Sequence, residues 1–102
     1  MNWLDRLRYS LFKKLKIELT NNYTGRKKDL LFDNGELFQK SIHTNVWTKV
    51  RIILIKNSYT IATDSWWVNP SNIVPLNLTN IYAMFDSLKQ THHIIINGKV
   101  YK

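Results

Sequence analysis

The fold is decided by residues 49–63, which read KVRIILIKNSYTIAT. Residues 49–56 are β-branched or aliphatic and almost continuously apolar, a pattern typical of a strand covered on both faces. Asn57 and Ser58 favour a turn, and residues 59–63 again suit a strand. These two strands predict a β-hairpin within a small antiparallel sheet.

The N-terminal residues predict a basic amphipathic helix over residues 3–18. Asn2 suits the N-cap position, and Asp5 completes a pattern that resembles a capping box. Four leucines recur at helical spacing and form one apolar stripe: Leu4, Leu7, Leu11 and Leu15. Such a stripe is typical of a helix with one face on a core.

The remaining chain predicts alternating turns and short elements. Asn34-Gly35 indicates a tight turn between apolar arms, and two prolines, Pro70 and Pro75, limit residues 69–76 to a turn or one helical turn. A second helix is expected over residues 79–90. It is followed by a strand over residues 93–96, a type I′ turn at Asn97-Gly98 and a short return arm.

Together these elements predict an α+β fold with one domain over residues 1–102. The domain is expected to comprise a basic helix (1–19), a loop with antiparallel strands (20–68), and a second helix with a C-terminal β-hairpin (69–102). A chain of 102 residues suffices for one modest core.

The charge of the chain is strongly unbalanced. Fifteen Lys and Arg against seven Asp and Glu give a net charge of +8 and a pI near 9.9. A polyanionic partner is therefore favoured, with nucleic acid first and an anionic membrane second. The chain has no cysteine, so disulfides, thiolate catalysis and cysteine zinc sites are excluded.

The candidate RNA-binding residues fall into three groups. The predicted helix carries Arg6, Lys13, Lys14 and Lys16, and a charge cluster after it carries Arg26, Lys27 and Lys28. The C-terminal residues Lys89, His92, Lys99 and Lys102 form the third group. Each group can contact phosphates, but a solvated surface that keeps the protein soluble explains the first two equally well.

Aromatic residues are frequent, and six are candidates for base stacking: Trp3, Trp47, Tyr59, Trp66, Trp67 and Tyr101. Core packing or a protein interface is the favoured reading. Trp66 and Trp67 would point to opposite sides of a continuing strand, so we expect one in the core and the other exposed or at a protein interface.

Residues 85–100, FDSLKQTHHIIINGKV, resemble the end of the alpha-L RNA-binding domain. This domain is shared by small-subunit ribosomal protein four, many pseudouridine synthases and the tail of tyrosyl-tRNA synthetase. The resemblance implies a helix that runs through a polar corner into a strand closed by an Asn-Gly turn, with cations at the corner on an RNA backbone. Phe85 and Asp86 stand where the family usually has a small residue and an arginine. The family's first helix would map to residues 69–78.

The sequence favours a structural protein over an enzyme. It has no paired carboxylates, no Ser-His-Asp order and no glycine-rich phosphate loop. His92 and His93 would face opposite ways in a strand, so neither a metal site nor a cofactor is expected. No small-molecule substrate is expected either.

The leading hypothesis is a ribosomal component of the mitochondrial small subunit, with rRNA and neighbouring ribosomal proteins as partners. Asn, Ile and Lys dominate the composition, which is typical of AT-rich coding DNA in organelles, bacteria and phages. One alternative is a phage or mobile-element protein that binds and inhibits a host protein in a bacterial cytoplasm. The other is a peripheral membrane protein whose first helix lies on anionic lipid.

Overall fold

The computed structural model describes residues 14–41, 43–63, 65 and 67–102. These residues form one antiparallel sheet and one short α-helix. The elements in chain order are β1 (Lys14–Asn21), β2 (Lys27–Asp33), β3 (Glu36–Lys40), β4 (Trp47–Ile55), β5 (Ser58–Thr63), the 3₁₀ helix η1 (Pro70–Asn72), β6 (Ile73–Val74), α2 (Leu78–Leu88), β7 (His92–Ile96) and β8 (Lys99–Val100).

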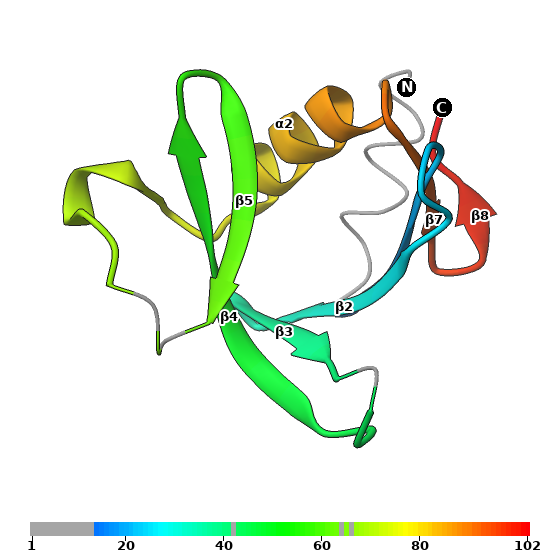
Figure 1. Ribbon diagram of the computed structural model, residues 1–102, viewed down its shortest axis with the longest axis horizontal. Coiled ribbons are helices and arrows are strands. Elements are labelled where there is room, and N and C mark those ends of the chain that lie inside the picture. Colours follow the sequence, from blue (N-terminus) through cyan, green and yellow to red (C-terminus); the bar gives the residue numbers. More distant parts are fainter. Residues whose placement is uncertain (1–13, 42, 64, 66) are drawn as a thin grey trace.

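The strands follow the order β5-β4-β3-β2-β1-β7-β8, and β6 pairs with β4 beyond the end of β3. The sheet bends strongly, and α2 lies across its concave side (Figure 1). We call this concave side the inner face and the opposite side the outer face. Because β5 and β8 are the two ends of the order, the sheet stays open.

The predicted α+β fold is wrong, because the described chain is mostly antiparallel sheet and residues 14–21 form β1 where the N-terminal helix was expected. Residues 3–13 of that predicted helix lie outside the described residues. Leu15, Ile17 and Leu19 are buried, whereas the residues between them are exposed, which is the period of two of a strand. Leu15 fits both periods. Pairing with β2 and β7 on both sides decides for the strand.

The central hairpin is confirmed. β4 and β5 pair through the turn Lys56-Asn57, one residue earlier than predicted, with both residues at positive φ. Both faces of β4 are covered, since the adjacent residues Ile52 and Ile53 are both buried. The predicted turn at Asn34-Gly35 is confirmed as well.

The second helix is confirmed as α2. The side chain of Asn77 caps it by accepting a hydrogen bond of 2.9 Å from the backbone N–H of Asn80. One face of α2 is buried against the inner face of the sheet, through Ile81, Tyr82, Met84 and Phe85. In the described part of the chain, no helix is long and apolar enough to cross a membrane.

The C-terminal hairpin is confirmed and is tied to β1. Asn97 and Gly98 have φ values of 50° and 83°, as a type I′ turn requires. The backbone N–H of Lys16 donates to Asn97 Oδ1, and the backbone N–H of Asn97 donates to the carbonyl oxygen of Lys16, both at 2.9 Å. These bonds fix the end of β7 against β1.

We expect Phe85→Ala to destabilise the protein by about 3–5 kcal/mol, since it empties a fully buried ring position. Phe85 also contacts the rings of Tyr82 and Tyr101 edge-on, at centroid distances of 6.2 and 5.3 Å. Urea unfolding measures the loss. The control Val46→Ala, at a residue 57% exposed, should cost no more than about 0.5 kcal/mol. Equal effects of the two substitutions would contradict this packing.

Candidate nucleic-acid interface

The β1–β2 hairpin ends in a compact basic loop. The side-chain oxygen of Asn21 accepts hydrogen bonds from the backbone N–H groups of Tyr23 and Thr24, at 2.8 and 3.1 Å. Gly25 has a φ of +71°, which glycine adopts without strain. The loop closes with a bond from Asn21 N–H to the carbonyl oxygen of Arg26, at 2.9 Å. This geometry fixes where the three consecutive cations, residues 26–28, leave the turn.

Pairing through β1 brings this loop beside the start of β7. Leu19 of β1 pairs with Lys28 on one side and with Ile94 on the other, and Asn21 pairs with His92. Directly opposed residues share a face of a sheet. Lys28 therefore lies at the edge of the inner face, near His92. The ring of His92 is held by Thr91, whose Oγ1 lies 2.8 Å from Nδ1.

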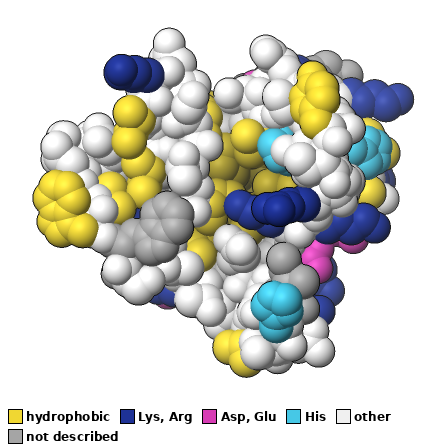
Figure 2. Space-filling model, in the orientation of Figure 1, with side chains coloured by type: hydrophobic (Ala, Val, Ile, Leu, Met, Phe, Trp, Pro, Cys, Tyr) yellow, Lys and Arg dark blue, Asp and Glu magenta, His cyan; other side chains and the backbone are white. Residues whose placement is uncertain are grey.

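Two adjoining hollows open at this end of the inner face, with volumes of about 180 and 250 Å³. We call them together the hairpin groove. Both hollows share the lining residues Leu19, Lys28 and His92. The smaller one reaches β5 and α2, and the larger one reaches the basic loop. Figure 2 shows hydrophobic side chains inside this hollow, between β5 and the β1–β2 hairpin, with Lys or Arg and His side chains along its hairpin side.

The hairpin groove combines a cationic rim with an apolar interior. Its basic lining residues are Arg26, Lys28 and His92, and its hydroxyl groups come from Thr24, Tyr59 and Thr60. The half-buried residues Ile61 and Leu88 line its interior above Leu19 and Met84, which are fully buried. Among the described lining residues, none is acidic.

The other predicted cations do not join this groove. Lys14 pairs with Asp33 at 3.9 Å, so it lies on the outer face at the far end of β1. Lys16 and Lys99 flank the Asn97-Gly98 turn. That turn and His92 lie at opposite ends of β7, roughly 13 Å apart.

The last of the predicted cations, Lys102, is the C-terminal residue of the chain. Lys102 is exposed, and since Tyr101 N–H bonds to the carbonyl oxygen of Ile94, the C-terminus runs back toward the His92 end of β7. Arg6 and Lys13 lie outside the described residues, as does Trp66. In the charge cluster, Lys27 and Lys28 are the first two residues of β2.

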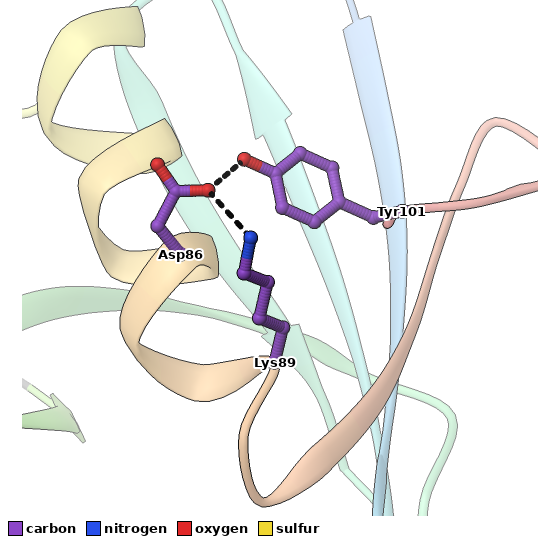
Figure 3. Close-up of polar contacts among 3 residues, drawn as sticks. All are labelled: Asp86, Lys89 and Tyr101. Atoms are coloured by element: carbon purple, nitrogen blue, oxygen red, sulfur yellow. Dashed lines mark hydrogen bonds and ion pairs between the residues drawn. The ribbon is translucent and has the colours of Figure 1, made fainter. Parts of the chain in front are cut away.

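Lys89 lies in a polar cluster at the end of α2 (Figure 3). The hydroxyl of Tyr101 donates a hydrogen bond of 2.6 Å to Oδ1 of Asp86, and Lys89 Nζ lies 3.8 Å from the same oxygen. Asp86 thus joins α2 to the residue after β8. Lys89 is partly neutralised by this ion pair.

A larger hollow of about 570 Å³ lies on the outer face. Its charged lining residues are Lys16, Glu18, Asp29 and Lys40. Two cations and two anions leave this outer groove without a net charge, so it does not suit a polyanion. Trp47, 44% exposed, also lines it.

Of the two tryptophans predicted for a protein interface, Trp67 belongs to the described residues. Trp67 is 87% exposed and follows β5 instead of continuing it.

Nowhere in the described residues do three or more His, Asp or Glu side chains gather in a way that would hold a metal ion.

Tyr101→Phe should lower the free energy of unfolding by about 1–2 kcal/mol, because it deletes a short hydrogen bond to a carboxylate and keeps the ring against Phe85. Chemical denaturation of both proteins measures the difference. Tyr23→Phe is the matched control, since Tyr23 is 81% exposed, and should change stability by less than about 0.5 kcal/mol. An unchanged stability of Tyr101→Phe would show that this hydrogen bond contributes nothing.

Comparison with protein-family models, curated proteins and solved structures finds no match to this chain. Membership in the alpha-L family therefore stays a prediction. The helix, strand and turn expected from it are present over residues 78–100, but η1 and β6 stand where the family has its first helix.

Proposed function

We propose that the protein is a non-enzymatic RNA-binding protein whose hairpin groove and basic loop contact the phosphates of an RNA strand. One observation carries this proposal. Arg26 and Lys28 of the β1–β2 hairpin meet His92 of β7, which is distant in the sequence, at one groove that no described acidic residue lines. Cations placed together without acidic neighbours suit a ligand with several negative charges.

The charge of the basic loop is available to a ligand. Within the described chain, Arg26, Lys27 and Lys28 form no ion pair, and all three are exposed. Each phosphate that they neutralise would release condensed counterions, so binding should depend steeply on salt. Tyr23, exposed beside them, offers an aromatic ring for an unpaired base.

The ribosomal assignment and the mitochondrial location remain predictions from the sequence. A structural component of a ribonucleoprotein needs backbone contacts and a stable scaffold, and the hairpin groove on a rigid sheet suits both. Recovery of the tagged protein with ribosomal particles, lost after ribonuclease treatment, would support this more specific assignment.

The proposal is tested by fluorescence anisotropy with a labelled RNA between 50 and 200 mM salt. The triple variant Arg26→Ala/Lys27→Ala/Lys28→Ala should bind more weakly. Its slope of log K against log salt should be shallower by about 2, since each lost contact to a single strand contributes about 0.7. Circular dichroism checks that the fold is retained.

A second triple variant, Lys16→Ala/Lys56→Ala/Lys99→Ala, removes the same charge from exposed positions outside the groove. It should keep most of the affinity and of the salt slope. Equal weakening by both variants would show that net charge alone binds RNA, and no wild-type binding at 50 mM salt would overturn the proposal. Equal binding of polyglutamate or of anionic vesicles would show that the groove binds polyanions in general and does not select RNA.

A second function, protein binding, is favoured by the exposure of Trp67. A tryptophan 87% exposed is a typical anchor of a protein interface. If the chain inhibits a host protein, Trp67→Ala should abolish the capture of one defined protein from ribonuclease-treated lysate, and RNA binding should be unchanged.

A further inference from the structure

We infer that the hairpin groove takes one unpaired nucleotide, with its base in the smaller hollow and its phosphate between Arg26 and Lys28. The protein would then prefer single-stranded RNA to paired RNA. This inference rests on the proposed function and adds the kind of RNA that the groove selects.

The smaller hollow has the size and lining that suit a single base. Its volume of about 180 Å³ lies below the roughly 300 Å³ at which pockets for drug-sized ligands begin. The half-buried residues Tyr59, Ile61 and Leu88 give it apolar walls. A planar base buried against these walls is removed from water, whereas a phosphate is better placed in the larger hollow, which both Arg26 and Lys28 line.

Two polar side chains that line this hollow, Tyr59 and His92, keep hydrogen-bonding capacity that no described residue uses. The hydroxyl of Tyr59 makes no hydrogen bond to a described residue, and His92 uses only Nδ1, toward Thr91. Both can therefore hydrogen-bond to the edge of a base or to a ribose hydroxyl. Such contacts orient a base that the apolar walls hold.

The larger of the two hollows of the hairpin groove, of about 250 Å³, provides the phosphate site. Lys28 lines both hollows and Arg26 lines the larger one, so a cation lies beside the base site and a second lies further along the groove. A nucleotide has the same arrangement, with a flat base attached to a charged backbone. The charge of the groove thus matches one strand that enters from the basic loop.

A duplex cannot use this arrangement. In A-form RNA the bases are stacked inside, and the protein meets only phosphates, riboses and the shallow minor groove. The basic loop can still contact a duplex through phosphates, but the apolar walls then remain empty. The inference therefore predicts a difference between single and double strands that charge alone does not produce.

The test compares a labelled 12-nucleotide RNA as a single strand and annealed to its complement, at 100 mM salt. The single strand should bind on the order of tenfold more tightly, which is the size expected for one stacked base. Tyr59→Ala should remove most of this advantage and leave duplex binding unchanged. Tyr59→Phe, the matched control, keeps the apolar ring and loses only the hydroxyl contact, so it should retain most of the advantage.

Because Tyr59 packs partly against the core, a third ligand tests the same point on the wild-type protein. A 12-nucleotide strand made entirely of abasic residues keeps the backbone phosphates and should bind about tenfold more weakly than the normal strand. Equal, salt-dependent binding of single strand, duplex and abasic strand would overturn this inference and leave the proposed function intact. Absence of binding to all three would overturn both. Tighter binding of an acidic peptide would assign the groove to a protein segment instead.

Discussion

The pairing of β1 with both β2 and β7 is the constraint on which the rest of the structure depends. It joins the first described residues to the last ones, and it buries Leu15, Ile17 and Leu19 in the centre of the sheet. It also determines where α2 lies, since α2 leads directly into β7 and must therefore pack on the inner face. The same register brings Lys28 and His92 to one end of the inner face, so the pairing that builds the core also builds the candidate site.

The open form of the sheet explains why a groove exists at all. β5 and β8 end the strand order without pairing to each other, and α2 occupies the space that a closed barrel would fill with strands. Its central residues are fully buried, whereas Leu88 near its C-terminal end stays half-buried. The groove is thus the place where the helix ends before the sheet does. An apolar interior beside a polar rim follows from that geometry.

Local signals in the sequence predicted the turns, the central hairpin and α2, because Asn-Gly pairs, the helical spacing of apolar residues and β-branched runs act over a few residues. The strand conformation of residues 14–21 was not predictable in this way, since Leu15 fits the helical spacing of the leucines as well as the alternation of a strand. Only the partners β2 and β7, distant in sequence, decide between the two. For the same reason the sequence named Lys28 and His92 but not their proximity, and it gave no sign that Leu88 lines a groove.

The positions of the acidic residues explain why net charge alone is a poor guide to the site. Four of the described acids lie on the outer face: Glu18, Asp29, Asp33 and Glu36. Asp86 is bound to Tyr101 and Lys89. A polyanion that approaches the outer face of β1–β3 therefore meets carboxylates among the lysines, whereas at the hairpin groove it meets Arg26 and Lys28 and no described acidic residue. The distribution of the five described acids, more than the surplus of bases, therefore distinguishes the two faces, and it leaves the end of the sheet where the apolar interior opens as the surface that suits a polyanion.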